Sequence, residues 1–221
     1  MQKSEIIWLF RERRSGSTWL RIYLSQLLRK QGYHIDDYIP DSYKYDRLTE
    51  WFKDRKQDKL DRTRILNTHF FEGLSSLDNY VNPIIIKTSR KNKLDQLISA
   101  YMGKVNNLAL QQYAPKLHIP NNKRVLNMEP CTIPHDAILD FIKNQKYIDM
   151  LWNQYAQNYN SEVVYYEDLQ QPHTIKVLNV HLDPMTKYHE NLPKKLPYDK
   201  KEIVLNYDEV ARIISENFEI Y

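Results

Sequence analysis

Residues 13–19, Arg-Arg-Ser-Gly-Ser-Thr-Trp, place two cations, three hydroxyls and a glycine next to one another. They follow the apolar run 6–10 and precede apolar residues spaced for a helix, from Leu20 to Leu28. A helix begins with unpaired N–H groups and the positive end of its dipole, which together favour an anion. The sequence therefore predicts an anion-binding turn between a buried strand and a helix.

Two further predicted strands end next to residues that suit the same chemistry. His69 follows the predicted strand 63–68, and Arg90 and Lys91 follow shortly after the predicted strand 83–88. Open parallel sheets bind ligands at the carboxyl ends of their strands, so these side chains are expected near the first turn. A histidine with a pKa of about 6.5 is able to accept a proton at neutral pH.

The turn at 13–19 is not a Walker A sequence, because no G-x-x-x-x-G-K-[ST] pattern passes through it. Its glycine lies directly before the helical pattern, which gives a shorter cradle than a triphosphate loop. We therefore expect one phosphate-sized group to bind at this turn.

The spacing of apolar residues predicts strands that alternate with helices. The predicted strands are 4–10, 63–68, 83–88 and 161–166, and the predicted helices are 17–31, 46–57, one covering 94–102, one from Pro134 through Tyr155 and one around 210–218. Such alternation favours a central parallel sheet flanked by helices, in a single α/β domain over residues 1–221.

Two stretches lack the pattern of a regular element. Residues 33–42 are rich in Asp, Tyr and Pro, which is typical of a loop, and residues 103–133 show no sustained periodicity. Long surface segments often carry binding functions. We expect residues 33–52, 70–80 and 103–133 to form an acceptor pocket, whose tyrosines and aspartates suit a polar, hydroxyl-bearing molecule.

The composition limits the kind of protein. The chain has 221 residues and a formal net charge of +4, which does not favour bulk nucleic-acid binding. Cys131 is the single cysteine, and the seven histidines show no ligand-like grouping, so neither a disulfide nor a metal site is expected. The N-terminal apolar run is too short for a signal peptide or a membrane span. We expect a soluble, cytoplasmic protein, and the composition leaves its oligomeric state open.

The turn resembles the 5′-phosphosulfate-binding loop of sulfotransferases, Lys/Arg-Ser-Gly-Thr/Ser-Thr-Trp-Leu, which residues 14–20 match. Three further segments are similar, in order and spacing, to cytosolic members of that family. Residues 64–69 resemble the strand that ends in the catalytic histidine, residues 90–101 the 3′-phosphate motif, and residues 163–169 the Tyr-Glu-Asp-Leu strand end.

The resemblance implies a P-loop-NTPase-like fold and sulfuryl transfer from 3′-phosphoadenosine-5′-phosphosulfate (PAPS). The acceptor would be a hydroxyl or amine of a small molecule or carbohydrate, and 3′,5′-adenosine bisphosphate would be the product. Arg14 would stabilise the leaving 5′-phosphate and His69 would act as general base. The residues that the resemblance assigns to the donor are Arg14, Ser15, Gly16, Ser17, Thr18, Trp19, Arg90, Lys91, Ser99 and Tyr166.

Each part of the donor has its own set of residues in this resemblance. The turn would hold the 5′-phosphate, while Arg90 or Lys91, with Ser99, would bind the 3′-phosphate. Trp19 would stack on adenine, and Tyr166 would line the adenine or active-site wall. Trp19 and Ser99 also have plainer interpretations, as a core aromatic residue and as an exposed helix serine.

The chain departs from the family pattern at several positions. Arg13 stands where a proline is common, and Asn67 replaces a lysine two residues before the histidine. The C-terminal Arg-Lys-Gly segment of cytosolic members has no recognisable counterpart; by charge alone, the candidates to replace it are Lys194-Lys195 and Lys200-Lys201. Some carbohydrate-type sulfotransferases use a carboxylate base, for which the candidates are Asp36, Asp37 and Glu72.

Two other functions stay open at this point. A nucleotide-dependent phosphotransferase would use the same turn, although the sequence has no Walker lysine and no clear Mg²⁺ carboxylate at a strand end. A non-catalytic nucleotide- or phospho-ligand-binding module would keep the turn without the transfer chemistry. Preference for 3′,5′-adenosine bisphosphate over ATP with Mg²⁺ would separate a sulfotransferase site from a kinase site.

Overall fold

The computed structural model describes seven stretches of the chain, residues 6–12, 14–31, 35–38, 63–68, 83–113, 130–184 and 199–218. These residues fall into two compact units. The sheet unit takes its residues from 1–89 and 150–184, and the helical unit takes its residues from 90–149 and 185–221. The sequence-based expectation of one domain stays a prediction.

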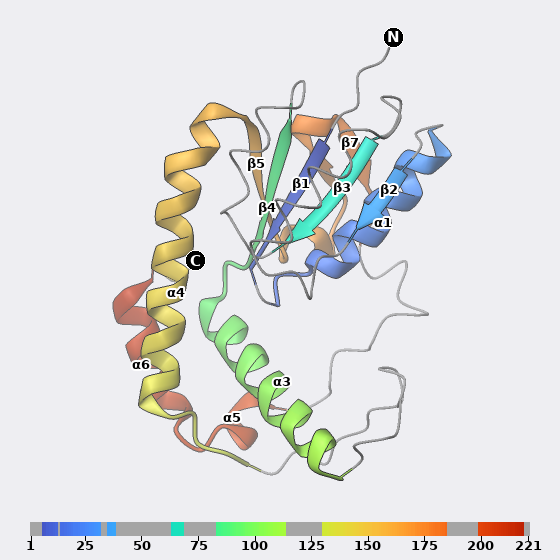
Figure 1. Ribbon diagram of the computed structural model, residues 1–221. Helices are drawn as coiled ribbons and strands as arrows, with labels where there is room; N and C mark the ends of the chain where they lie inside the picture. The colour runs from blue at the N-terminus through green and yellow to red at the C-terminus, as the bar shows by residue number, and fades with distance from the viewer. Residues whose placement is uncertain are drawn as a thin grey trace. The chain divides into compact units, whose positions relative to one another are not determined.

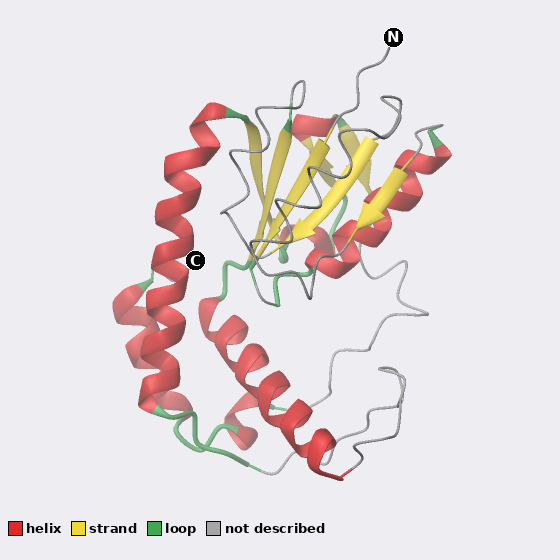
Figure 2. Ribbon diagram, in the orientation of Figure 1, coloured by secondary structure: helices red, strands yellow, loops and turns green. Residues whose placement is uncertain are grey.

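The sheet unit contains a five-stranded parallel sheet with the order β2-β3-β1-β4-β5 (Figures 1 and 2). The strands are β1 (Ile6–Arg11), β2 (Ile35–Tyr38), β3 (Thr63–Thr68), β4 (Ile84–Ser89) and β5 (Asn160–Tyr165). The central strand β1 is continuously apolar, and Trp8, Leu9 and Phe10 are fully buried. The predicted α/β class with a parallel sheet is confirmed.

Helix α1 (Ser17–Lys30) links the first two strands and packs against β1, β2 and β3. Leu20, Leu24 and Leu28 recur at helical spacing and are buried, which explains why this segment forms a helix on the sheet. Arg29 and Lys30 lie in its last turn, where cations interact favourably with the helix dipole.

The two central strands lead the chain in opposite directions. After β1 the chain passes through α1 to β2, which is the edge strand on the far side of β3. After β4 it leads to β5, which is the edge strand at the opposite end of the sheet. Ligands of open parallel sheets bind at such a reversal, outside the carboxyl ends of the strands. In this fold that position lies beyond Arg11 of β1 and Ser89 of β4.

One sequence prediction about the sheet unit was wrong. Residues 35–38 form strand β2 within the stretch that was expected to be a loop. The strand is parallel to β3, with Asp36 opposite Arg64, and an edge position tolerates its polar residues. The antiparallel hairpin of β6 (His173–Ile175) and β7 (Val180–Leu182) was not predicted either. The short 3₁₀ turns of this unit are Ala156–Asn158, Asp168–Gln170 and Lys176–Leu178.

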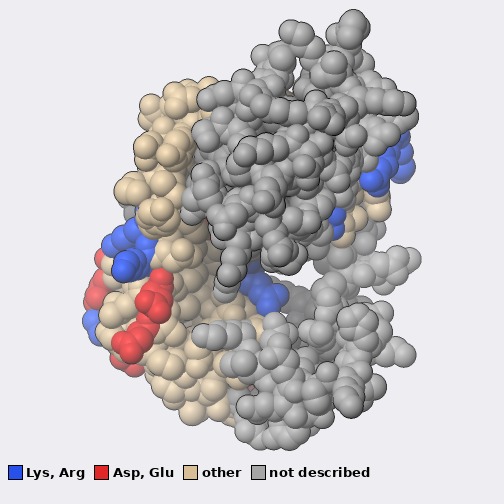
Figure 3. Space-filling model, in the orientation of Figure 1, with Lys and Arg blue, Asp and Glu red and all other residues tan. Residues whose placement is uncertain are grey.

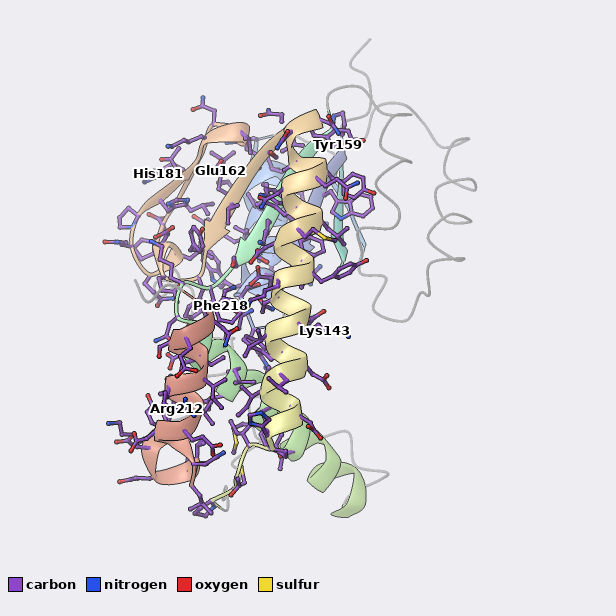
Figure 4. All side chains as sticks on the ribbon, turned by 90° about the vertical axis from the view of Figure 1, so that its left-hand side faces the viewer. Lys143, Tyr159, Glu162, His181, Arg212 and Phe218 are labelled. Atoms are coloured by element: carbon purple, nitrogen blue, oxygen red, sulfur yellow. The ribbon has the colours of Figure 1, made fainter. Side chains whose placement is uncertain are left out.

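The helical unit is built from α3 (Lys93–Tyr113), α5 (Lys200–Ile203), α6 (Tyr207–Asn217) and the first part of α4 (His135–Tyr155). Its core is apolar and draws on all four helices; the buried residues are Leu97, Ile98, Met102, Ile133, Ile138, Ile142, Ile203, Val204, Val210, Ile213 and Ile214. Phe218 lies directly after α6 (Figure 4) and packs edge-on against Phe141 of α4, with ring centroids 6.4 Å apart.

Helix α3 is longer than the sequence predicted. The stretch from residue 103 was expected to be a surface loop, but α3 continues through Gly103 to Tyr113. The glycine and the pair Asn106-Asn107 have low helix propensity, which hid the helix from pattern reading. Residues 114–129, like the predicted helix at 46–57, lie outside the described residues.

Charges of both signs are intermixed on the surface near α4 and α6, on the face drawn in Figure 3. Arg212 and Glu216 form an ion pair of 2.8 Å on this part of α6. Among the described helices, none combines the length and apolar character that a membrane crossing requires.

Candidate functional site

The turn between β1 and α1 has an unusual backbone. Arg14 has a φ of 60° and Gly16 a φ of 76°, so two left-handed residues occur within three positions. Arginine rarely adopts this conformation, which costs about 1–3 kcal/mol when the surrounding structure imposes it. The Arg14 side chain is exposed, so the turn presents a cation to solvent at the start of α1.

Ser15 fixes the turn to the ends of both central strands. Its buried hydroxyl donates to the backbone oxygen of Glu12 at 2.7 Å and lies 2.8 Å from the hydroxyl of Thr88. Because the Ser15 proton points to Glu12, the Thr88 hydroxyl donates in the second bond. The Ser15 hydroxyl thus forms its hydrogen bonds within the protein. We therefore expect the backbone of Ser15, and not its side chain, to contact a ligand.

Tyr166 closes over the glycine of the turn. A Cβ added to Gly16 would lie 2.8 Å from Cδ2 of Tyr166, closer than real Cβ contacts. The backbone N–H of Tyr166 donates to the oxygen of Ser89 at 2.9 Å, which fixes this residue to the end of β4. Both the positive φ and the close approach of Tyr166 therefore require glycine at position 16.

The first turn of α1 offers N–H groups to an anion. The first hydrogen bond of the helix runs from the N–H of Leu20 to the oxygen of Gly16 at 3.0 Å. The N–H groups of residues 17–19 lie before this bond and point out of the start of the helix. Within this described helix, no side chain caps the N-terminus and the first turn contains no acidic residue. Ser17 is more than nine-tenths buried at the same place.

A buried ion pair, which the sequence analysis missed, lies beside the turn. The Glu12 carboxylate contacts Nζ of Lys87 at 3.2 Å and accepts a bond of 2.9 Å from the Ser89 hydroxyl. The ammonium of Lys87 also lies 5.9 Å from the ring centroid of Trp152. A lysine inside the buried run 84–89 was the signal that could have revealed the pair, because a buried charge needs a partner.

Trp19 belongs to the interior of the sheet unit. It is buried and stacks on Tyr23, with ring centroids 5.0 Å apart and an interplanar angle of 14°. The hydroxyl of Tyr23 in turn accepts a bond of 3.2 Å from the N–H of Asp183. This environment fits the interpretation of Trp19 as a core aromatic residue, and its stacking on adenine stays a prediction.

The residues predicted to bind the 3′-phosphate belong to the helical unit. Arg90 is largely buried, and its Nη2 lies 3.3 Å from Oδ2 of Asp95 in the first turn of α3. Nζ of Lys200, in the charged C-terminal segment, contacts the other oxygen of Asp95. Lys91 and Ser99 are half-buried, and Ser99 lies one helical turn after Asp95.

Several predicted residues lie outside the described part of the chain. They are Arg13, His69, Glu72, Lys194 and Lys195. His69 directly follows Thr68, the last residue of β3, and β3 pairs with β1. Of the alternative bases, Asp36 and Asp37 lie on the edge strand β2.

The site is chemically an anion site. Exposed Arg14 and the free end of α1 favour a negatively charged group, and the nearby Glu12 carboxylate is matched by Lys87. No group of three or more His, Cys, Asp or Glu side chains that could hold a metal occurs in the residues that the structure describes.

Comparisons with known proteins give little beyond this geometry. No protein-family model and no curated protein matches the chain. The crystal structure of APE1195 is similar over 67% of this chain and 98% of its own, with 18% sequence identity and a TM-score of 0.39. At this TM-score the similarity supports neither a fold family nor an activity.

Proposed function

We propose that the protein is a sulfotransferase that transfers the sulfuryl group of PAPS to a hydroxyl or amine of a small molecule or carbohydrate. The proposal includes a P-loop-like arrangement, in which the turn after β1 holds the 5′-phosphosulfate. It rests on the four sequence segments that resemble sulfotransferases and on the construction of that turn.

The observation that carries the proposal is the fixed turn at residues 14–17. Ser15 ties it to both central strands, and Gly16 leads directly into an uncapped helix. The turn lies where the chain direction reverses between β1 and β4, which is the usual ligand position in open parallel sheets. This construction supports the binding of one phosphate-sized anion.

Different groups of the turn would bind the donor and stabilise the charge that develops during transfer. Backbone N–H groups of residues 17–19 would hold the 5′-phosphate, and Arg14 would stabilise the charge that develops on it. The donor supplies a sulfur whose bond to the phosphate oxygen breaks as its bond to the acceptor oxygen forms. His69 would take the acceptor's proton, as the resemblance implies.

Ligand preference tests the proposal directly. Thermal-shift titrations would compare 3′,5′-adenosine bisphosphate with ATP plus Mg²⁺. A bound ligand raises the melting temperature according to its affinity, so the bisphosphate should give the larger shift. A larger shift with ATP would overturn the proposal in favour of a phosphotransferase. Bisphosphate binding without sulfuryl transfer to a panel of phenols, alcohols, amines and sugars would instead indicate a binding module.

Two variants test the assigned roles. Arg14→Ala should lower kcat/KM about 100-fold, because it removes a charge that acts on the leaving phosphate. Arg29→Ala, an exposed arginine at the other end of α1, is the matched control and should retain wild-type kinetics. His69→Ala should lower kcat by about 100-fold or more at neutral pH. A wild-type rate in His69→Ala would move the base to a carboxylate such as Asp36, Asp37 or Glu72.

A further inference from the structure

Glu12, the first residue after β1, is fixed to β4 through both its backbone and its side chain. Its N–H donates to the Thr88 oxygen at 3.1 Å. Oε2 of its carboxylate accepts a bond of 2.9 Å from the Ser89 hydroxyl, and Oε1 lies 3.2 Å from Nζ of Lys87. Three consecutive residues of β4 thus hold one buried residue at the point where the turn begins.

The turn that follows is fixed at its other end as well. The Ser15 hydroxyl donates to the Glu12 backbone oxygen at 2.7 Å and lies 2.8 Å from the Thr88 hydroxyl. Arg14 lies inside the loop that the first of these bonds closes, and its φ is 60°. A positive φ is unfavourable for arginine and persists where the surrounding structure imposes it. The bonds of Glu12 and Ser15 to β4 supply that constraint.

Stability alone gives a weak reason for a charged pair beside the turn. The attraction between two buried charges is largely offset by the cost of taking both out of water, and apolar residues of similar size often do as well. Strained residues, in contrast, gather where a ligand must be met in one fixed geometry. The exposed Arg14 side chain, three residues before α1, occupies such a place. The buried pair and the strained arginine are therefore best explained together.

We propose that Glu12 is a positioning residue that acts through Arg14. By holding the start of the turn against β4, it keeps the Arg14 backbone in its strained conformation and aims the guanidinium at an anion on the first turn of α1. Lys87 supplies the opposite charge that a buried carboxylate needs. This inference rests on the proposed function, in which Arg14 stabilises the leaving 5′-phosphate of PAPS.

The first experiment separates positioning from stability. The double variant Glu12→Gln with Lys87→Met removes both charges together and should keep most of the folding stability. With the best acceptor of the panel, its kcat should fall about tenfold and its KM for PAPS should change less, because Arg14 acts on charge that develops in the transition state. The matched control is Glu162→Gln, which should keep wild-type kinetics. Glu162 is a half-buried carboxylate of the same unit and accepts a bond of 3.0 Å from the N–H of Val177.

The same change in an Arg14→Ala background tests the route of the effect. If Glu12 acts through Arg14, the double change should lower kcat by less than about twofold once Arg14 is absent, since residues that act as a unit are not additive. A loss of about tenfold in both backgrounds would overturn the inference. Should the double variant fail to fold, Ser89→Ala removes one bond to the carboxylate and keeps both charges. It should lower kcat about two- to fivefold, and only when Arg14 is present.

A second experiment tests the strain without an enzyme assay. Arg14→Gly should raise the urea midpoint of unfolding, because glycine adopts a positive φ freely. The rise should be smaller in the Glu12→Gln, Lys87→Met background, which no longer imposes the strained conformation. Asn179→Gly is the control, because Asn179 also has a positive φ, 50°, but precedes β7 in the hairpin. It should shift the midpoint equally in both backgrounds.

The outcomes separate this inference from the proposed function. Sulfuryl transfer by the wild type, with an unchanged kcat in the double variant, overturns the positioning role and leaves the sulfotransferase proposal standing. A wild type that transfers no sulfuryl group overturns the proposed function, and the midpoints then decide whether Glu12 holds the turn. Equal gains from Arg14→Gly in both backgrounds overturn that role. A loss of kcat that requires Arg14, with a reduced gain from Arg14→Gly, supports it.

Discussion

Each unit of the molecule contains a carboxylate that contacts a lysine, and the two arrangements differ in burial. In the sheet unit, the side chains of Glu12 and Lys87 are 0% and 5% exposed, and the Ser89 hydroxyl donates to the second carboxylate oxygen of Glu12. In the helical unit, Asp95 and its two cations keep 9–25% exposure. The first pair is enclosed by the protein, whereas the second group of charges keeps partial contact with solvent.

The difference follows from where each group is placed in its unit. Glu12 directly follows β1 and Lys87 lies in β4, where water is excluded and the loss of either charge removes this partner of the other. Asp95 lies in the first turn of α3, where the helix dipole favours its carboxylate, and both Asp95 and Lys200 keep partial contact with solvent. The enclosed pair therefore joins the ends of two inner strands beside the turn, whereas the charges around Asp95 keep partial contact with solvent.

The largest effect is expected from a variant that breaks the enclosed pair of Glu12 and Lys87. Lys87→Ala should reduce the free energy of unfolding by about 3–5 kcal/mol, because it leaves the Glu12 carboxylate buried without its cation. The tryptophans among the described residues, Trp8, Trp19 and Trp152, lie in the sheet unit, so urea unfolding followed by tryptophan fluorescence reports on that unit.

Two control variants sharpen this comparison. Lys200→Ala should lower the free energy of unfolding by less than about 1 kcal/mol, because the charges around Asp95 are partly solvated. The measurement is unfolding followed by the circular dichroism signal of the helices. The double variant Glu12→Gln with Lys87→Met should recover most of the Lys87→Ala loss, since an uncharged pair of similar size needs no counter-ion. Equal losses in Lys87→Ala and Lys200→Ala would contradict the distinction between the two clusters.

The next effect concerns the turn that the enclosed pair supports. Gly16→Ala should destabilise the sheet unit by about 1–2 kcal/mol from its left-handed backbone alone, with a further penalty from the Tyr166 contact. Adding Tyr166→Ala should remove the contact part and leave the backbone part. The measurement is the urea midpoint by fluorescence, and an unchanged midpoint in Gly16→Ala would show that the turn is not held as described.

A smaller effect compares two serines. Ser15→Ala should lower the free energy of unfolding by about 1–3 kcal/mol, because the Glu12 oxygen loses the Ser15 donor and the buried Thr88 hydroxyl keeps only its longer bond of 3.5 Å to the Phe10 oxygen. Ser215→Ala removes a bond of similar length, 2.7 Å to the Arg212 oxygen, but on the exposed side of α6. The free energy of unfolding of that variant, measured by circular dichroism, should stay within about 0.5 kcal/mol of the wild-type value. Similar losses at both sites would argue against a structural role for the Ser15 bonds.

The smallest effect is a pH dependence in the helical unit. Burial, and then the nearby carboxylates of Asp95, Asp199 and Asp208, raise the pKa of Tyr207 above its usual 10.0. The folded state then keeps the phenolic proton longer than the unfolded state. The stabilisation is therefore complete below about pH 10 and is lost as pH rises through the folded pKa.

This dependence is visible in unfolding measurements at alkaline pH. The free energy of unfolding should fall less steeply between about pH 9 and 11 in Tyr207→Phe than in the wild type. Asp95→Asn should lower the pKa of Tyr207, which an ultraviolet titration of the phenol would record. If the free energy of unfolding of Tyr207→Phe fell with pH as steeply as that of the wild type, the raised pKa of Tyr207 would be contradicted.

Elements with strong local patterns were predictable from the sequence. The apolar runs that became β1 and β4, and the leucine spacing of α1, are patterns contained within a few residues. Strand β2 depends on pairing with β3, and its sequence Ile-Asp-Asp-Tyr has weak strand propensity by itself. A pattern within one segment does not report such pairing.

The site shows the same division between local and distant information. The turn at Arg14–Ser17 was recognisable because its residues are consecutive. The pairing of Glu12 with Lys87 depends on the register of β1 and β4, and the contact of Asp95 with Lys200 joins positions 105 residues apart. Charge counting marked Lys200 as a candidate, but only the fold identified its partner.

The order of the two units along the chain has a consequence for synthesis on the ribosome. The helical unit starts at Arg90, is interrupted after Asp149 by the last part of the sheet unit, and is completed only by α5 and α6. A nascent chain emerges from its N-terminus, so β5 is available to the sheet before α6 is available to α3. Until then the apolar side of α3, with Leu97 and Ile98, lacks part of its covering. We expect the helical unit to fold last and to need more protection from aggregation while the chain is being made.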